Sequence, residues 1–469
     1  MPHREIQFGK VYNNLDESQT PEGLSAEFID GYVDETNDHV KRDGLTLFKT
    51  ITGTASIDGL YETQSVSPGT VLVATNGVVY KMASNGDLTT MTGAAYDNPG
   101  TQVNWAEAYD YVYCASGGKP HRVDLTNNTL ADVGGNSPTT CSHIVWMQKF
   151  LMTNGLDTSG AGNKGDIHFS SDGSDKYELT DSWEVYNNET HPDDCSALLS
   201  DWEEVFSVGP RSIEVRYNDG STPFARLEGT FANWGTVSGN SVCLINGSLY
   251  FLMERESDVK IGRIQKRTPD IISWPFDSKI KGLATHSDAR AWSVVMKGRP
   301  FYVISWPTSN LTLAYNIEQD NWTQWGHWNG ASHDRWLGNC YLYSRGHNKH
   351  YVGDRRGTGK VFTISGTQDD SGTIRMQLRS GFISGQTDIT KYNNFVRTKT
   401  TGASFSLQYR NDGTGSFGNS RTVTNPSGKF YTRTNRWGAY RQRQWELIHT
   451  NNETFVLSEF MEDYREGVR

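Results

Sequence analysis

The stretch GSLYFLMERESDVKIGRI, residues 247–264, contains two runs of strand-forming residues separated by a short polar segment. Related phrases occur at VLVATNGVVYKM (71–82) and LTLAYNIEQDNWTQW (311–325). Markers in successive phrases lie about 43 to 52 residues apart, the length of one β-propeller blade; they are Val79, Arg122, His168, Glu214, Ile261, Leu313 and Val361. One such unit cannot bury both faces of its sheet, whereas a ring of units can. The sequence predicts an all-β protein with a six-bladed propeller, seven blades being possible.

Composition supports an all-β fold with many tight turns. The 469 residues include 47 Gly, and the 14 Trp, 22 Tyr and 19 Phe supply large apolar areas although only 35% of residues are hydrophobic. We expect Trp105, Trp146, Trp183 and Trp292 to lie mainly between sheets. The start, MPHREIQFGK, has no apolar segment and the chain has no long apolar run, so we expect no signal peptide or membrane span. Five scattered cysteines favour buried free thiols.

The limits of the repeated phrase and a Gly/Asp/Ser-rich segment divide the chain into three predicted parts. Residues 1–64 lack the repeated phrase and are predicted to form an N-terminal arm with short strands. Residues 65–365 are predicted to form the propeller, and GTQDDSGT (366–373) is a candidate boundary. Residues 366–469 contain alternating runs that predict an antiparallel C-terminal β domain, with a hairpin turn at Asn411-Asp412-Gly413.

Charge is distributed unevenly along a chain whose net charge is -10. This balance argues against wrapping nucleic acid, because phosphate affinity needs a basic surface. Residues 172–204 are rich in acids, which makes Asp193, Asp194, Glu203 and Glu204 candidates for an acidic channel or partner surface. Residues 391–443 are rich in bases, and the candidate docking surface is Arg433, Arg436, Arg441 and Arg443. A solvated face is the plainer interpretation of either segment.

No motif in the sequence identifies catalytic chemistry or a cofactor. Residues 160–165 match GxGxxG, but a strand-like run follows where a dinucleotide site needs a helix. His347 and His350 lie three residues apart in a polar turn, which alone lacks the geometry of a metal site. Carboxylates are numerous, yet no pair can be nominated as a glycosidase dyad. We therefore expect no enzyme activity, no cofactor and no metal.

The order of three segments resembles the packaged-DNA stabilisation protein family of short-tailed bacteriophages, also called tail hub or nozzle proteins. The best match is the segment DIHFSSDGSDKYELTDSWEVYNNETHPDDCSALLSDWEEVFSVGPRSIEVRY, residues 166–217. FIDGYVDET…DGLTLF is similar to the family's opening, although Asp43 stands where a proline is usual. LQYRNDGTGSF…RWGAYRQRQWELIHT resembles its closing β domain.

The resemblance implies a structural protein that forms a hexameric ring below the portal and its adaptor. The ring would close the DNA exit channel and conduct the genome during ejection, with a tail fibre, tailspike or tail needle as a further partner. Duplex DNA would pass without specific binding, because acidic walls repel it. The protein would be part of the virion tail, assembled in the host cytoplasm. Two alternatives stay open: a glycan-degrading propeller and a glycan-binding propeller of a tail.

Overall fold

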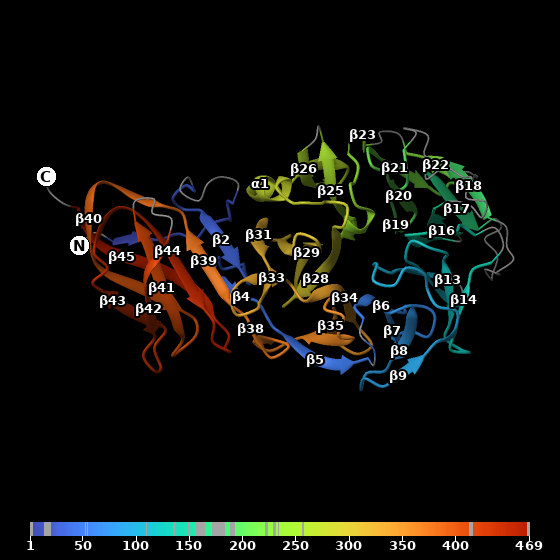
Figure 1. The fold of residues 1–469 in the computed structure, drawn as a ribbon. Helices are drawn as coiled ribbons and strands as arrows, with labels where there is room; N and C mark the ends of the chain where they lie inside the picture. The colour runs from blue at the N-terminus through green and yellow to red at the C-terminus, as the bar shows by residue number, and fades with distance from the viewer. Residues whose placement is uncertain are drawn as a thin grey trace.

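A ring of β-sheets makes up most of the molecule, and a second group of strands adjoins it on one side (Figure 1). The structure is a computed structural model. It describes residues 3–13, 20–51, 53, 55–108, 110–134, 137–148, 150–155, 165–170, 183–187, 193–220, 224–227, 231–232, 234–255, 258–411 and 416–466. Helical segments in these ranges are short: η2 (Gly239–Ser241), η3 (Trp274–Phe276) and α1 (Asp277–Lys281). Within these ranges, no helix is long and apolar enough to cross a bilayer.

Seven groups of four successively paired strands follow one another from β6 to β36, the last of them completed by β5. The sixth group is part of a 15-stranded sheet, and the seventh is part of a 6-stranded sheet. Sheet 1 is β6 (Ile57–Glu62), β7 (Val71–Thr75), β8 (Val78–Met82) and β9 (Leu88–Thr90). Sheet 2 is β11 (Asn104–Ala108), β12 (Tyr111–Ala115), β13 (His121–Asp124) and β14 (Thr129–Asp132), with β10 (Thr92–Gly93) added at its edge. Sheet 3 is β15 (Ile144–Met147), β16 (Phe150–Asn154), β17 (Asp166–Ser170) and β18 (Trp183–Asn187).

The ring continues through four further sheets. Sheet 4 is β19 (Ala197–Asp201), β20 (Glu204–Val208), β21 (Ser212–Tyr217) and β22 (Ala225–Arg226), with β23 (Phe231–Ala232) also on β21. Sheet 5 is β24 (Cys243–Ile245), β25 (Ser248–Arg255), β26 (Asp258–Gln265) and β27 (Thr268–Ile271). Sheet 6 is β28 (Arg290–Met296), β29 (Arg299–Trp306), β30 (Leu311–Asn316) and β31 (Asn321–Gln324). Sheet 7 is β34 (Gly338–Ser344), β35 (Lys349–Asp354), β36 (Lys360–Ile364) and β5 (Leu45–Thr50).

Tight hairpins join these strands because the turn residues accept a left-handed backbone. Asn76 (φ 51°) and Gly77 (φ 79°) connect β7 to β8, and Asn246 (φ 50°) and Gly247 (φ 69°) connect β24 to β25. Two consecutive positive φ values give the turn whose twist matches paired strands, and Asn-Gly is its preferred sequence. The turns that punctuate the repeated phrase are therefore visible in the sequence.

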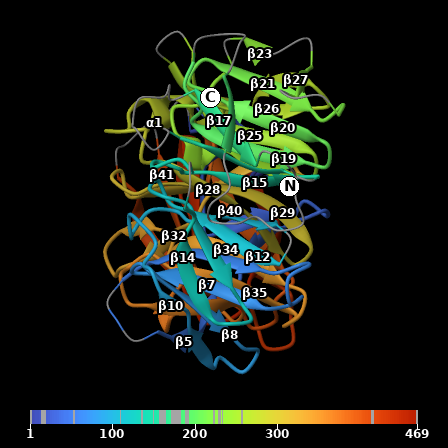
Figure 2. The ribbon, with the colours of Figure 1, turned by 90° about the vertical axis from the view of Figure 1, so that its right-hand side faces the viewer.

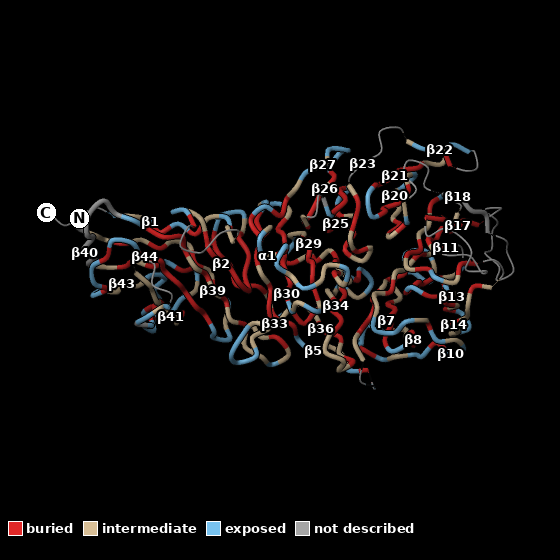
Figure 3. The backbone as a smooth tube through the Cα atoms, turned by 45° about the horizontal axis from the view of Figure 1, so that its top comes forward, coloured by how far each residue is buried: buried red, intermediate tan, exposed pale blue. Residues whose placement is uncertain are grey.

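Buried apolar side chains hold each sheet to the next. Val79, Val112 and Val123 share a cluster between sheets 1 and 2, and comparable clusters join each following pair as far as sheets 6 and 7. The remaining cluster, with Ile57 and Val361, joins sheet 7 back to sheet 1. Figure 2 shows the sheets from the side of the ring, and Figure 3 shows buried residues along their strands. Every sheet thus buries both of its faces.

The N-terminal strands before residue 65 take part in both halves of the molecule. β5 pairs with β36 as the fourth strand of sheet 7, with β37 on its other side, and β6 is the first strand of sheet 1. The ring is therefore closed by a strand that precedes it in sequence, so the predicted arm of residues 1–64 also contributes strands to the ring. The apolar residues Leu45 and Ile57, both fully buried, supply the reason.

The other early strands join the end of the chain. These are β1 (His3–Glu5), β2 (Ser25–Ile29), β3 (Gly31–Val33) and β4 (His39–Lys41). The late strands are β39 (Met376–Ser380), β40 (Ile383–Thr398), β41 (Ser404–Asn411), β42 (Gly418–Thr424), β43 (Tyr431–Asn435), β44 (Ala439–His449) and β45 (Val456–Glu466). All pairings among the late strands in the described ranges are antiparallel. β41 and β42 pair as expected, while most of the turn predicted at 411–413 lies outside the described residues.

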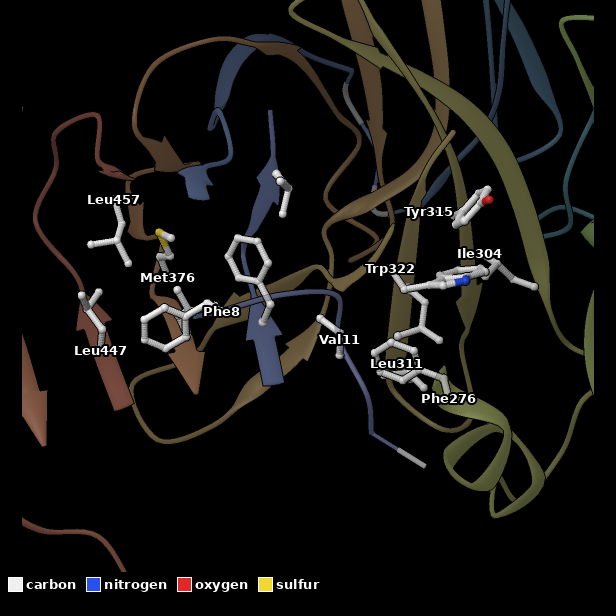
Figure 4. Packing of buried hydrophobic residues seen from close by; sticks show 14 of the residues in the cluster. Phe8, Val11, Phe276, Ile304, Leu311, Tyr315, Trp322, Met376, Leu447 and Leu457 are labelled. Atoms are coloured by element: carbon white, nitrogen blue, oxygen red, sulfur yellow. The ribbon is translucent and has the colours of Figure 1, made fainter. Parts of the chain in front are cut away.

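A continuous core crosses from the ring to the late strands. β2 pairs in parallel with β31 at Ile29 and Gln324 and antiparallel with β39 on its other side, so sheet 6 continues into the late strands. Figure 4 shows Phe8 beside Met376 and Leu447, with Val11 between this group and Leu311. Three single apolar residues of the N-terminal segment, Ile6, Phe8 and Val11, therefore pack into the seam between the two regions. We call β1–β4 and β39–β45 the terminal sheet region.

Candidate interaction surfaces

A cavity with both aromatic and polar side chains in its wall lies at the first strands of successive sheets, and we call it the central cavity. It has a volume of about 430 Å³, and its wall comes mainly from the first strands of sheets 1 to 4, with Tyr61, Trp105, Trp146 and Leu199 among the lining residues. The rings of Tyr61 and Trp105 stack with centroids 5.9 Å apart. A cavity of this size suits a small molecule and is too small for a duplex.

The cavity offers little for hydrolytic chemistry. Glu107, the one carboxylate among the described lining residues, accepts hydrogen bonds from the backbone N–H groups of Gln64 (2.7 Å) and Ser65 (2.8 Å). Across the described ranges, no three His, Cys, Asp or Glu side chains gather as a metal site would require. His347 instead bonds the Tyr351 hydroxyl (3.0 Å) and His350 the Tyr341 hydroxyl (2.7 Å). An enzyme would need convergent carboxylates or arginines here.

The tryptophans expected between sheets are divided between two environments. Trp292 is buried in the cluster between sheets 6 and 7. Trp105 and Trp146 are only partly buried, because they line the central cavity as well as packing on their own sheets. The side chain of Trp183 lies outside the described residues, as does the GxGxxG segment apart from Gly165.

The four candidate acidic residues lie at two ends of one strand. Asp193 and Asp194 precede β19, and Glu203 and Glu204 follow it. Five residues of strand span about 17 Å, so the two pairs do not form one surface. Asp193 Oδ2 accepts hydrogen bonds from the backbone N–H groups of Arg211 (2.7 Å) and Ser212 (3.0 Å), which fixes the loop before β21. Most of the acidic stretch between residues 171 and 192 lies outside the described residues.

An exposed tryptophan stands between the acids at the other end of β19. Asp201 pairs with Glu204, so Trp202 and Glu203 form a two-residue hairpin loop. Trp202 has 91% of its surface exposed and a φ of 53°, and of the two loop residues only it has a positive φ. Glycine is the preferred residue at that position of such a turn. A bulky indole there is costly to the single chain, which makes the loop a candidate contact.

Three of the four candidate arginines are exposed on the terminal sheet region. Arg433 lies on β43, Arg436 in the following loop, and Arg441 on β44. β43 and part of β44 both pair with β40, so this segment follows that long strand. Phe430 (52% exposed) and Tyr431 (43%) lie beside the arginines, with exposed Lys429. We call these six residues the basic aromatic face: Lys429, Phe430, Tyr431, Arg433, Arg436 and Arg441.

Arg443 is buried and belongs to the core, so it does not extend the docking surface. Its guanidinium lies 4.0 Å from the ring centre of Tyr409 and 4.2 Å from that of Tyr440, and its Nε donates to Asn411 Oδ1 (2.8 Å). Stacking on aromatic faces offsets part of the desolvation of the charge. Arg441 lies in the mostly exposed first part of β44, whereas Arg443 begins the continuously buried run that extends to His449, a difference that the charge count of the segment does not reveal.

A buried ion cluster fixes the two regions together. The Arg42 guanidinium donates to Asp30 Oδ1 (2.8 Å), Asp369 Oδ1 (2.9 Å) and the backbone oxygen of Gly326 (2.6 Å). All three charged side chains are at most 1% exposed. Asp30 follows β2, Arg42 follows β4, and Asp369 lies on β37 (Gln368–Asp369) beyond sheet 7. The cluster therefore ties the terminal strands to the ring, and burial raises the pKa of Asp30 against the opposing charge of Arg42.

Two functional features have weak or absent sequence signals. Trp202 is flanked by acids in DWEE, a turn-like position where a tryptophan is unusual and which a scan for turn chemistry can flag. The Arg42, Asp30 and Asp369 cluster joins residues up to 339 positions apart, and no local pattern connects them. The five cysteines are free, and burial raises the pKa of Cys114 to about 12, so these thiols are unreactive at neutral pH.

Comparisons with known proteins give one family and several distant folds. The family model described as Bacteriophage P22 Gp10, beta-propeller, matches residues 39–364. The chain matches no curated protein. Similar solved structures include the extracellular domain of the putative one component system BT4673 from B. thetaiotaomicron, at 10% identity, 93% coverage of this chain, 62% of that chain and a TM-score of 0.43. The chain thus spans about three fifths of that domain.

Another similar structure is the N-terminal domain of Nup159, at 11% identity, 72% coverage of this chain, 98% of that chain and a TM-score of 0.44. The computationally designed Ika8 protein matches at 13% identity, with 68% and 100% coverage and a TM-score of 0.33. The family match starts close to β4 and ends with β36, and so covers the ring of sheets.

Proposed function

Because this chain belongs to the phage P22 Gp10 β-propeller family, whose members stabilise packaged DNA, we propose that it forms a ring-shaped nozzle of a short phage tail. The ring closes the DNA exit channel, retains the packaged genome and conducts it during ejection. Its partners are further copies of the chain, six in all, the portal adaptor, and a fibre, tailspike or needle protein. The observation that carries this proposal is the family match across the ring of sheets.

We infer that the seven sheets are the seven blades of the propeller. Support comes from the cluster that joins sheet 7 to sheet 1 and from β5, which completes sheet 7 from the N-terminal side. The propeller on this account spans residues 45–364. The terminal sheet region, which includes β1–β4, forms the added β domain. A closed ring of blades gives a rigid body, and a channel that resists the pressure of packaged DNA needs rigid walls.

The DNA path runs between copies and not through the propeller. The central cavity of the propeller, of about 430 Å³, supports this assignment because it is too small for a duplex. A conducting wall should not bind the duplex, since each phosphate contact adds salt-dependent friction. We propose that the exposed Asp194 and its neighbours before β19 contribute to a repulsive wall, while Glu203 and Glu204 belong to a different surface.

Phage particles that lack the chain test the proposal. Such particles, complemented with the purified chain or left without it, are assayed for nuclease-protected genome and for infection. We expect uncomplemented capsids to fill and then lose their DNA, and complemented capsids to keep it. Uncomplemented particles that retain DNA and infect would contradict the proposal. Uncomplemented particles that retain DNA but fail to attach to cells would instead support a glycan-binding role.

A further inference from the structure

The hairpin loop of Trp202 presents an apolar anchor that the single chain does not use. The indole is 91% exposed at a strained turn position, in a molecule whose other tryptophans are mostly buried or partly buried. We define the tip as Asp201, Trp202, Glu203 and Glu204. Local strain that gives the monomer no packing is expected where a partner supplies it. Tryptophan is also among the residues that contribute most to binding energy at interfaces.

An ion pair with the neighbouring hairpin holds the tip in place, and the tip carries excess negative charge. Arg267, on the neighbouring β26–β27 hairpin, donates to Glu204 Oε1 at 2.6 Å. Lys266 and Arg267 both have positive φ, so that second hairpin is a tight turn of fixed shape. The tip and this hairpin together hold three carboxylates against two cations, and Glu203 is exposed beside the indole. A partner for the tip should therefore offer aromatic contact and positive charge.

The chain itself carries a surface with this chemistry. On the basic aromatic face, Phe430 and Tyr431 are exposed beside Arg433, and Arg436 follows at the end of β43. Arginine can stack on the face of an indole and can also bind a carboxylate through two parallel hydrogen bonds. Charge and aromatic character are thus complementary between the tip and this face.

The two surfaces cannot meet within one molecule. The β19–β20 hairpin lies across the ring of sheets from β43, with sheet 6 between them (Figure 1). A contact between unlike surfaces of two copies is head-to-tail, and such contacts generate rings when the rotation closes. We infer that the Trp202 tip of each copy docks on the basic aromatic face of the next copy. This inference rests on the proposed ring and names the surfaces that form it.

Complementation between two defective copies tests the contact. Trp202→Ala removes the tip and leaves the face intact, whereas Arg433→Glu combined with Arg436→Glu removes the face and leaves the tip. Trp274→Ala is the matched control, because Trp274 is also exposed (44%) but packs near Tyr12 at a different site. Mass photometry measures the oligomers of each chain and of an equimolar mixture, and negative-stain images of tails complemented with each chain show whether a ring is present.

We expect Trp202→Ala to weaken self-association roughly 30-fold or more, as for loss of a central interface tryptophan. Each defective chain alone should stay monomeric, and their mixture should form dimers through the one intact tip and the one intact face. Trp274→Ala should behave as the wild type does. Rings of Trp202→Ala in solution or in complemented tails, at the wild-type level, would overturn the contact and leave the nozzle proposal standing. Wild-type tails with no ring of this chain would overturn both.

Discussion

The ring of sheets and the terminal sheet region differ in how their buried charged side chains find partners. Neighbouring sheets of the ring meet through aliphatic side chains such as Val112, Ile213 and Val361, which are fully buried. Buried charge is held locally in the ring, where Arg216 pairs with Glu214 of the same strand at 2.7 Å. In the terminal region it is held by distant partners, with Arg443 between two tyrosines and Arg379 paired with Glu446 at 2.6 Å. A repeated apolar contact needs only a local pattern, whereas a buried ion pair needs one specific partner. Ring contacts can therefore be predicted from nearby sequence more readily than the ion pairs of the terminal region.

The largest expected effect comes from breaking the buried cluster that joins the two regions. Arg42→Ala leaves Asp30 and Asp369 buried without their cation and should lower the free energy of unfolding by about 3–5 kcal/mol. Urea denaturation followed by tryptophan fluorescence measures the change. Lys10→Ala is the control: it removes an exposed pair with Asp320 and should cost less than about 1 kcal/mol. Equal losses in the two variants would refute the assigned role of the cluster.

Removing an apolar contact of the ring should lower the free energy of unfolding almost as much, and this loss should not depend on salt. Ile213→Ala, in the cluster between sheets 4 and 5, should cost about 2–5 kcal/mol through lost burial and a cavity. The loss of unfolding free energy in Ile213→Ala should be the same at low and high salt and should not change with pH. The loss in Arg42→Ala should change with pH, because it leaves two buried carboxylates without their cation. A strongly salt-dependent loss in Ile213→Ala, measured by the same denaturation, would contradict a purely apolar contact between sheets 4 and 5.

Acid should destabilise the protein through buried histidines. Burial lowers the pKa of His39, His143 and His449 to about 4, below the usual value of about 6.5. The unfolded chain therefore takes up more protons, so stability is complete above about pH 6.5 and falls as the pH drops toward 4. Each histidine contributes roughly 1.4 kcal/mol per pKa unit of difference.

The histidine prediction is checked with denaturation midpoints between pH 7 and 4. His39→Gln should flatten the slope because glutamine takes up no proton. Identical slopes for His39→Gln and the wild type would show that His39 does not titrate between the folded and unfolded states as proposed.

The smallest effect on stability is expected on the basic aromatic face. Arg433→Glu with Arg436→Glu should change the free energy of unfolding by less than about 0.5 kcal/mol, because both side chains are exposed. The same pair should abolish self-association, and milder substitutions to Gln should make it more salt-sensitive. A large loss of folding stability would mean that these arginines serve the fold and not assembly.

The sequence predicts the repeated part of the fold because its signals are local. The Asn76-Gly77 turn and the alternating runs around it are sufficient to place sheet 1, and the family resemblance is confirmed by the match over residues 39–364. Closure by β5 is not visible locally, since its partner β36 lies more than 300 residues away. For the same reason the sequence assigns residues 1–64 to an arm, while the structure divides their strands between ring and terminal region.

Candidate surfaces are predictable in charge but not in orientation. A count of bases finds Arg433, Arg436, Arg441 and Arg443 together, yet the last of them lies in the buried run of β44. A count of acids joins Asp193 to Glu204 although β19 separates them. Trp202 is missed by a charge count for a different reason, because it is uncharged. It is nevertheless the most exposed large apolar side chain among the described residues.

Cryo-electron microscopy of the assembled phage tail tests the central claim most directly. The account predicts a ring of copies in which each β19–β20 hairpin contacts the β43 region of the next copy, with Trp202 buried against Phe430, Tyr431 and Arg433. The duplex path should run along the axis of that ring, outside every propeller. Copies related by two-fold contacts, a Trp202 that stays in solvent, or DNA density within a propeller would contradict it.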